Sequence, residues 1–368
     1  MTIIVYAVAS RSGGALSVLK DFYEEVKLNK DKYPEIKWIF VLSDQDLEDT
    51  DNIKIVKIPW VTKSLFHRLV ANLTVIKRIY ADNNARAIVS LQNMRVFGLN
   101  KPTIVSLHNV LPLYNCNFEV LDTVKALIKQ YFVNRAIIKS LKRAKAVLVP
   151  SRWIREELTT KFGIKKSDIK ICKTPISSNM YSGSQEELSE PVTFFYPAAS
   201  YPYKNHRIIV EAVSLLEKQD IRDFKVLFTF THDQGKHATY LWKIAQPYLD
   251  RIVFCGELPR EKVLSLYNKA VLIFSSKIET DAMPLLESMQ AGGKIIAISL
   301  PYSQEAIGTY SKQVMFKNDD VNTLASYMAE VIRTKKLPKN TITVDQAPNE
   351  NIKSRVEVVV ESLCDLEL

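Results

Sequence analysis

The sequence has few glycines and few cysteines. Its 368 residues include 10 glycines, well below the average usage of about 7%, so each glycine marks a position of interest. Four cysteines occur without a C-x-x-C pair or a Cys/His cluster: Cys116, Cys172, Cys255 and Cys364. This spacing offers neither a zinc site nor a disulfide framework, and it predicts a reducing, cytosolic compartment.

Several targeting and binding signals are also missing. No apolar run approaches the roughly 20 residues of a membrane-spanning helix, and the start, MTIIVYAVAS, lacks the basic lead and cleavage site of a signal peptide. Neither a G-x-G-x-x-G fingerprint nor a Walker GxxxxGK[ST] loop occurs, which argues against dehydrogenases and P-loop enzymes. Without an RRM, KH or zinc-finger pattern, nucleic acid is not an expected partner.

Acidic residues do not indicate a metal site. The pairs Asp44/Asp46 and Asp49/Asp51 have the D-x-D spacing of some metal-nucleotide sites. They lie, however, in one hydrophilic stretch that is typical of a solvated loop. The sequence therefore predicts no metal ion.

The composition is that of a packed protein with more than one core. Hydrophobic residues make up 47% and charged residues 24% of the chain, and its length exceeds what one core usually covers. Short β-branched or aromatic runs alternate with longer amphipathic ones, which is typical of parallel sheets covered by helices. We predict strands at 3–8, 36–42, 53–58, 87–90, 103–107, 146–149, 169–172, 193–196, 226–230, 252–255, 271–275, 295–298 and 314–316, and first-half helices at 15–27, 62–81, 120–143 and 154–162.

The alternation stops between residues 173 and 191, where Ser, Gly, Glu and Pro predominate. We therefore predict an α/β protein of two Rossmann-like, doubly wound domains, residues 1–175 and 192–345, joined by a linker at 176–191. Residues 346–368 contain an amphipathic helix that can pack back on the N-terminal domain. Ligands of such folds bind beyond the carboxyl ends of the strands, and we expect them in a cleft between the domains.

Basic residues are concentrated in one part of the chain. The formal net charge is +10, and residues 51–150 contain sixteen Lys and Arg against four Asp and Glu. The clearest segment is 120–145, where cations alternate with Leu, Ile, Tyr and Phe. Such a helix can lie on anionic lipid, or it can be an ordinary helix with its charges in water. Both interpretations stay open, and the charge favours an anionic partner.

Two loops that follow predicted strands carry residues suited to a phosphate. Gly13 and Gly14 open the first predicted helix, where a missing Cβ lets backbone N–H groups approach an anion. Lys204 and Asn205 lie in a polar turn between a strand and a helix, where the ammonium group can meet a phosphate as a point charge. The alternatives are a tight turn for the glycines and a solvated surface position for Lys204.

The segment VLIFSSKIETDAMPLLESMQAGGKIIAIS, residues 271–299, contains two glutamates eight residues apart. Glu279 lies in a loop, and Glu287 lies on a helix whose first turn holds Pro284. The two carboxylates can meet a ligand across the helix N-terminus, whose free N–H groups suit a diphosphate. An acidic residue in this position can also serve only to complement the helix dipole.

His108, in VSLHNVLPLY, ends another predicted strand. A neutral imidazole there can hydrogen-bond a sugar hydroxyl or share a developing proton. Histidines in such positions are more often ordinary core or loop residues, so His108 by itself does not decide between the two.

Taken together, these clusters resemble GT-B glycosyltransferases, specifically the retaining group called glycosyltransferase family 4. The most specific part is the E-x7-E from Glu279 to Glu287. The other matching segments are Gly13-Gly14, His108 with Pro112, PSRWIREEL at 150–158, KNH at 204–206 and FCGELPREKVLSLY at 254–267. The family implies that the N-terminal domain holds the acceptor and the C-terminal domain holds a nucleotide sugar, with catalysis in the cleft.

The resemblance also implies roles for single residues. Glu279, His108 and Lys204 would be catalytic, with Glu279 on the transferred sugar and His108 beside it. The implied donor contacts are Glu287 at the ribose, Glu257 and Leu258 near the base, Met283, Pro284 and Leu285 at the sugar and diphosphate, Lys204 with Asn205 at the diphosphate, and Gly13 and Gly14 at the donor phosphate or the acceptor.

Two positions depart from the family pattern. The family often has an arginine five residues before the phosphate lysine, where this chain has Ala199. A glycine usually precedes the proline of the motif, where this chain has Ala282, which restricts the backbone.

We therefore expect a retaining glycosyltransferase that moves a sugar from a nucleoside-diphosphate sugar, with UDP or GDP as the nucleotide, to a glycan acceptor that is lipid-linked, in cell-surface polysaccharide synthesis. No further cofactor is required, because fixed cations and helix N–H groups can stabilise the leaving diphosphate. The expected location is cytoplasmic, at the inner face of the cell membrane. The alternative, favoured by Ala199 and Ala282, is a catalytically silent GT-B-like subunit that binds a partner or a glycan.

Overall fold

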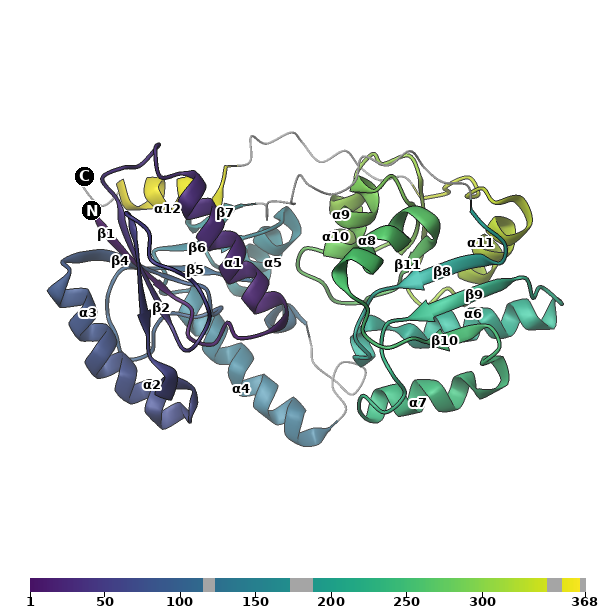
Figure 1. Ribbon diagram of the computed structural model, residues 1–368, viewed down its shortest axis with the longest axis horizontal. Coiled ribbons are helices and arrows are strands. Elements are labelled where there is room, and N and C mark those ends of the chain that lie inside the picture. Colours follow the sequence, from purple (N-terminus) through teal and green to yellow (C-terminus); the bar gives the residue numbers. More distant parts are fainter. Residues whose placement is uncertain (115–122, 173–187, 343–352, 365–368) are drawn as a thin grey trace. The chain divides into compact units, whose positions relative to one another are not determined.

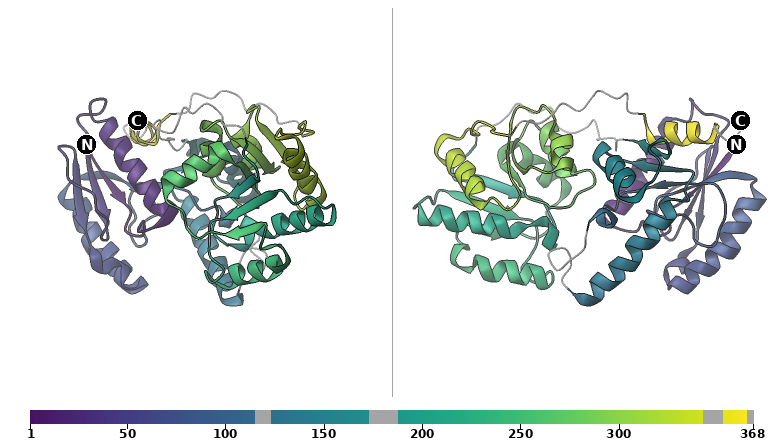
Figure 2. Two further views of the ribbon diagram at one scale, coloured as in Figure 1. Left: turned by 45° about the vertical axis from the view of Figure 1, so that its right-hand side comes forward. Right: turned by 180° about the vertical axis from the view of Figure 1, so that it is seen from behind.

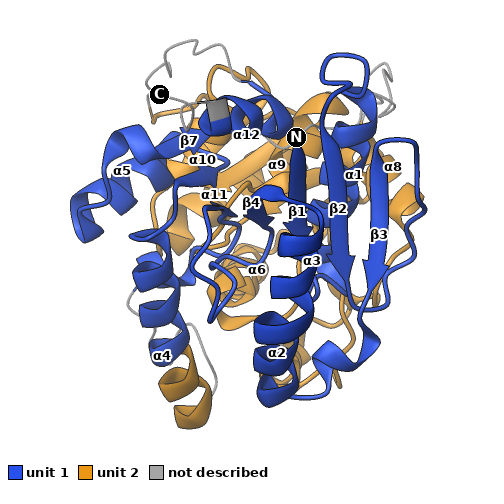
Figure 3. Ribbon diagram, turned by 90° about the vertical axis from the view of Figure 1, so that its left-hand side faces the viewer, with its two compact units in different colours: residues 1–115, 131–175, 350–368 blue, residues 116–130, 176–349 orange. Residues whose placement is uncertain are grey.

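The computed structural model describes residues 1–114, 123–172, 188–342 and 353–364. The chain divides into two units, each with one parallel sheet that has helices on both faces (Figure 1, Figure 2). Unit 1 comprises residues 1–115, 131–175 and 350–368, and unit 2 comprises residues 116–130 and 176–349 (Figure 3). No helix in the described residues has both the length and the apolar character needed to cross a membrane.

The sheet of unit 1 has seven parallel strands in the order β3-β2-β1-β4-β5-β6-β7. They are β1 Thr2–Tyr6, β2 Lys37–Leu42, β3 Ile53–Lys57, β4 Ala85–Ser90, β5 Thr103–Ser106, β6 Ala146–Val149 and β7 Ile169–Ile171. The α-helices of this part are α1 Gly13–Leu28, α2 Leu65–Ala71, α3 Lys77–Asp82, α4 Val124–Leu141, α5 Arg152–Phe162 and α12 Arg355–Cys364. The order reverses between β1 and β4, which is where open α/β sheets form their binding crevice.

The central strand β1 is buried on both faces. Ile3 and Val5 pack with α1 and α12 on one face, and Ile4 and Tyr6 pack with α2 and α3 on the other. This alternation is the period of two of a strand, and it explains why β1 is a continuous apolar run in the sequence.

Helix α12 is joined to unit 1 by a buried ion pair. The Nε of Arg355 donates to Oε1 of Glu25 on α1 at 2.9 Å, and the two side chains are only 5% and 7% exposed. Burial raises the pKa of Glu25, and the charge of Arg355 opposes that rise. Because a buried charge is tolerated only beside its partner, this pair fixes where the last helix lies on α1.

The sheet of unit 2 has six parallel strands in the order β10-β9-β8-β11-β12-β13. They are β8 Val192–Tyr196, β9 Phe224–Phe228, β10 Ile252–Phe254, β11 Val271–Phe274, β12 Lys294–Ile298 and β13 Gln313–Phe316. Its α-helices are α6 His206–Lys218, α7 Lys236–Ala245, α8 Arg260–Lys269, α9 Met283–Gln290, α10 Pro301–Ile307 and α11 Val321–Thr334. Helices α6 and α7 lie on one face of the sheet and α8, α9 and α10 on the other (Figure 1).

All thirteen predicted strands are found, with ends that differ by at most two residues from those expected. The predicted helix at 62–81 is found as a helix from Leu65 to Asp82 that contains a π-helical turn, Asn72–Ile76. Inside that turn the buried Asn72 accepts a hydrogen bond from Tyr6 Oη at 2.7 Å, a contact that no periodicity reveals. Most of the predicted linker at 176–191, and the first part of the segment 346–368, lie outside the described residues.

Candidate functional site

The strand order of unit 2 reverses between β8 and β11. The loops that leave these neighbouring strands therefore run to opposite faces of the sheet and open a crevice at their carboxyl ends. The loop after β8 carries Ala199, Lys204 and Asn205, and the loop after β11 carries Glu279 and Ala282. Three of the residues expected in the C-terminal domain, Lys204, Asn205 and Glu279, thus come from the loops at this switch point.

Lys204 and Glu279 meet at this switch point. The Nζ of Lys204 donates to Oε1 of Glu279, and the side chains are 19% and 14% exposed. The carbonyl oxygen of Lys204 accepts from Tyr196 Oη at 2.9 Å and Ser275 Oγ at 3.1 Å, which ties the β8 loop to the end of β11. The main chain at Lys204 is therefore held in place, and the ammonium and carboxylate groups are held by their contact with each other.

Glu287, on α9, does not join that pair. Its carboxylate is buried and accepts from Tyr267 Oη at 2.9 Å, while Arg260 Nη2 lies 2.5 Å from Oε1. Burial, followed by the Glu287 charge, holds the pKa of Tyr267 well above its usual value, so its hydroxyl remains a donor. Lys204 therefore pairs with Glu279, while Glu287 pairs with Arg260.

Arg260 and Tyr267 were not predicted. They are seven residues apart on α8 and therefore lie on one face of that helix. The spacing was visible within FCGELPREKVLSLY, but which side chain on another helix they would meet was not.

A cavity of about 490 Å³ opens beside Glu287. Its lining includes several of the expected donor contacts: Glu257, Leu258, Met283, Pro284 and Glu287. Ala199 and Arg260 line the same cavity, so an arginine from α8 is present in the cavity where the family's arginine is missing. Leu285 does not line it, because its side chain is fully buried and its N–H donates to the Ala282 carbonyl at 2.8 Å.

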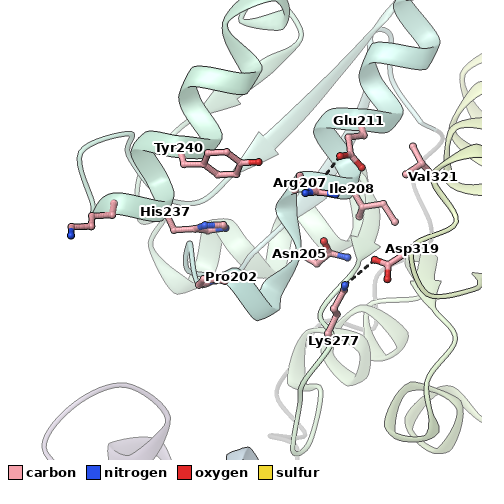
Figure 4. A pocket seen from close by; sticks show the side chains of 11 residues that line it. Pro202, Asn205, Arg207, Ile208, Glu211, His237, Tyr240, Lys277, Asp319 and Val321 are labelled. Atoms are coloured by element: carbon pink, nitrogen blue, oxygen red, sulfur yellow. Dashed lines mark ion pairs between the residues drawn. The ribbon is translucent and has the colours of Figure 1, made fainter. Parts of the chain in front are cut away.

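Asn205 faces a different cavity of unit 2. It has a left-handed φ of +54° where α6 begins, and it lines a space of about 550 Å³ with Arg207, Glu211, Lys277 and Asp319 (Figure 4). Ion pairs join Arg207 to Glu211 at 2.9 Å and Lys277 to Asp319 at 2.8 Å. Asn205 therefore shares the loop of Lys204 but not the cavity of Glu287.

Ala282 has a left-handed backbone immediately before α9. Its φ is +46° and its side chain is buried. An L-residue in this conformation costs roughly 1–2 kcal/mol. The glycine that the family usually has nearby would avoid this strain.

We expect Ala282→Gly to raise the free energy of unfolding of unit 2 by up to about 1 kcal/mol, since relief of the strain exceeds the extra entropy of the unfolded glycine chain. Urea unfolding measures the change. The matched control is Ala291→Gly at the end of the same helix, where φ is −73° and a loss of about 0.5–1 kcal/mol is expected. A destabilised Ala282→Gly protein would contradict the assignment of strain.

The remaining predicted residues belong to unit 1. Helix α1 begins at Gly13, whose φ is +56°, and a Cβ built on Gly13 or Gly14 meets no atom within 4 Å. The N-terminus of α1 is therefore open. His108 follows β5, where its Nε2 donates to the Leu91 carbonyl at 2.9 Å and its Nδ1 lies 3.4 Å from Ser106 Oγ.

Burial lowers the pKa of His108 to about 4, although the Leu91 contact opposes the shift. An unfolded histidine titrates near 6.5, so between these values the unfolded chain binds more protons than the folded one. We therefore expect stability to fall as the pH falls from 6.5 to 4. Replacing His108 by Gln should flatten this part of the curve of urea midpoint against pH. The same slope in both proteins would contradict the shifted pKa.

The sequence matches two family models, one after the other. Residues 37–179 match the family described as Glycosyltransferase Family 4, and residues 179–344 match the family described as Glycosyl transferases group 1. No curated protein matches the sequence.

Solved structures with the same fold cover nearly the whole chain. A glycosyltransferase from Rickettsia africae is 16% identical, with a TM-score of 0.64, over 99% of this chain and 93% of its own. The lipopolysaccharide outer core galactosyltransferase WaaB in its apo form is 14% identical, with a TM-score of 0.62, over 99% and 94%. HepE from Anabaena, in complex with UDP-glucose, is 14% identical, with a TM-score of 0.62, over 91% and 90%.

Proposed function

Because the chain belongs to the GT-B glycosyltransferases and is similar to family 4, we propose that it transfers a sugar from a nucleoside-diphosphate sugar to a glycan acceptor with retention of configuration. The observation that carries the proposal is the cavity of unit 2, where a buried carboxylate, Glu287, lies with the first turn of α9. A helix N-terminus attracts phosphate oxygens, and a carboxylate accepts hydrogen bonds from ribose hydroxyls.

In this proposal Glu287 binds the ribose. Tyr267 and Arg260 each engage one of its oxygens, and a carboxylate has about four acceptor sites, so capacity remains for sugar hydroxyls. Glu257 and Leu258 lie near the base, on the loop that precedes α8. Met283 and Pro284 approach the diphosphate at the start of α9.

Lys204 neutralises the leaving diphosphate, and Glu279 contacts the transferred sugar. Breaking the sugar–phosphate bond builds negative charge on the diphosphate, and a cation already fixed in place stabilises that charge without reorganisation. Arg260 supplies a second cation in the cavity that Ala199 lines. Within unit 1, Gly13, Gly14 and His108 serve the acceptor side, and the leaving phosphate assists deprotonation of the acceptor on the same face.

A panel of UDP-, GDP-, ADP- and dTDP-sugars, read by thermal shift and by nucleotide release, tests this proposal. The structure of HepE with UDP-glucose supports a UDP-sugar as the first compound. A ligand at one hundred times its Kd stabilises the folded state by about 2.7 kcal/mol, so the right donor raises the melting temperature. No shift with any sugar contradicts the proposal, while binding without transfer or hydrolysis identifies a silent binding subunit.

The finer proposal is a lipid-linked glycan acceptor, used in cell-surface polysaccharide synthesis at the cytoplasmic face of the membrane. Its support is the basic segment 51–150 and the exposed apolar side chains of α4, which include Ile128, Tyr131 and Phe132. A helix with basic and apolar side chains can lie on anionic lipid.

We expect the protein to float with vesicles that contain anionic phospholipid and not with vesicles of neutral lipid alone. Each basic residue near such a surface contributes about 1 kcal/mol, and salt at 0.5 M should release the protein because it screens these charges. Equal recovery with both vesicle types would remove the membrane part of the proposal and leave the donor site unaffected.

A further inference from the structure

Unit 1 contains a cavity of about 1110 Å³ that is lined by cations. It lies between the loop at 95–103 and the end of α4 with the turn that follows it. Among the residues that the structure describes, five basic ones line it and no acidic one does: Arg95, Lys101, Lys139, Arg143 and Lys145.

These five cations differ from several others on unit 1 that pair with carboxylates. Elsewhere Arg11, Lys30 and Lys57, for example, pair with Asp44, Asp51 and Asp46. In the part of the chain that the structure describes, none of the five cavity cations forms an ion pair with a carboxylate. The negative end of α4 offsets only about half a charge, so most of the positive potential of the cavity is uncompensated.

Arg95 is the cavity cation whose contacts are best defined. Its backbone N–H donates to Ser140 Oγ of α4 at 2.5 Å, which fixes the loop against the helix. Its Nη2 has two distant contacts, 3.4 Å from Asn100 Oδ1 and 3.4 Å from the Lys101 carbonyl, and its buried Nε has no partner. Arg95 thus lines the cavity with a guanidinium group whose charge no carboxylate among the described residues neutralises, and such a group can bind an anion through two parallel hydrogen bonds.

The cavity is separate from the expected reaction site. Lys101 precedes β5 and Lys145 precedes β6, and the N–H of Lys145 donates to the Thr103 carbonyl at 2.8 Å. These residues lie at the amino ends of the strands, whereas Gly13 and His108 follow the carboxyl ends of β1 and β5. A ligand held by Lys101 and Lys145 would therefore leave the crevice of unit 1 open.

We propose that this cavity is a binding site for a phosphate-bearing ligand, distinct from the nucleotide-sugar site. Arginine binds phosphate with two parallel hydrogen bonds and lysine adds point charge, so the five cations suit a group with a charge of −1 to −2. The source is either the head group of an anionic phospholipid or a free phosphate ester. Phe97, which lines the cavity with 72% of its surface exposed, favours the head group, since it places an apolar ring beside the phosphate site.

The test compares two double variants with the same change in charge. Lys101→Glu with Lys145→Glu alters the cavity, and Lys20→Glu with Lys165→Glu alters two exposed lysines of unit 1 outside it. Each basic residue at an anionic surface is worth a factor of about five in affinity. We expect the cavity variant to bind phosphatidylglycerol-containing vesicles at least 25-fold more weakly than the wild type. The control variant should bind the same vesicles less than about threefold more weakly.

A second arm distinguishes the two sources. If both variants bind vesicles equally, thermal stabilisation by inorganic phosphate is compared next. A stabilisation that the wild type and the control variant show and the cavity variant lacks assigns the site to a free phosphate ester. Equal vesicle binding together with equal phosphate stabilisation overturns the proposal. Thermal stabilisation by the nucleotide sugar shows that the variants are folded. If no donor binds, urea unfolding serves as the test of folding instead. The proposal of a donor site can therefore fail without affecting the proposal of a phosphate site.

Discussion

Replacement of Lys204 by alanine is expected to lower kcat/KM for sugar transfer by about 1000-fold. The reason is that a preorganised charge facing the leaving group typically contributes two to three orders of magnitude to the rate. Lys204 is held for this role by the hydrogen bonds of its own carbonyl to Tyr196 and Ser275. Lys204→Arg, which keeps the charge, should recover part of the rate. Steady-state kinetics with the donor identified by thermal shift measures both.

The pairing of Lys204 with Glu279 requires a further control, because removing the cation leaves a mostly buried carboxylate without its partner. If Lys204 served only to hold Glu279, the double variant Lys204→Met with Glu279→Gln would restore stability and activity together. We expect it to restore stability alone. Lys277→Ala removes a lysine of the β11 loop that pairs with Asp319, and it should change kcat/KM less than threefold. A Lys204→Ala enzyme within threefold of the wild type would exclude the proposed role.

Replacement of Glu287 by alanine is expected to weaken donor binding about 100-fold. Hydrogen bonds to a charged group contribute about 1.5–3 kcal/mol. Without the carboxylate, the ribose would lose these hydrogen bonds and would no longer be held in its position. Glu287→Gln should show a smaller loss, since the amide keeps one acceptor oxygen. Tyr267→Phe removes the hydroxyl that holds Oε2, and we expect it to raise the Kd for the donor by less than tenfold.

Calorimetry with the nucleotide sugar, and with the nucleotide alone, measures these effects. Because the ribose belongs to both ligands, the loss in the Glu287→Ala protein should be the same for each. Glu261→Gln provides the control, since Glu261 is an exposed acidic residue on α8 next to Arg260. If Glu287→Ala weakened binding of the nucleotide sugar but not of the nucleotide alone, Glu287 would contact the transferred sugar and not the ribose.

The central strands were predictable because they are buried on both faces. Segments such as Val271–Phe274 and Ile295–Ile298 are apolar without interruption, and only the interior of a parallel sheet tolerates such runs between polar loops. The loops after β8 and β11 were predictable for a related reason, because alternating strands and helices place strand ends at one edge of the sheet. That Lys204 and Glu279 are near one another depends also on the adjacency of β8 and β11, which only the structure gives.

Contacts between side chains far apart in the sequence were not predictable. Arg260 was overlooked because its partner, Glu287, is on another helix. Asn205 adjoins Lys204 in the chain, yet its left-handed backbone turns it towards a different cavity. The pairing of Arg355 with Glu25 spans 330 residues, and no local pattern contains that information.

The sequence by itself determined the class of the molecule: two α/β units, their strands and the loops that carry the candidate residues. These properties depend on local periodicity and on which residue types the backbone accepts at each position. The tertiary structure alone decided which charges pair, which cavity each residue lines, and that five cations of unit 1 line a cavity to which no carboxylate of the described chain contributes. The physical reason is that ion pairs and cavities arise between elements, where distance in space is set by packing and not by position along the chain.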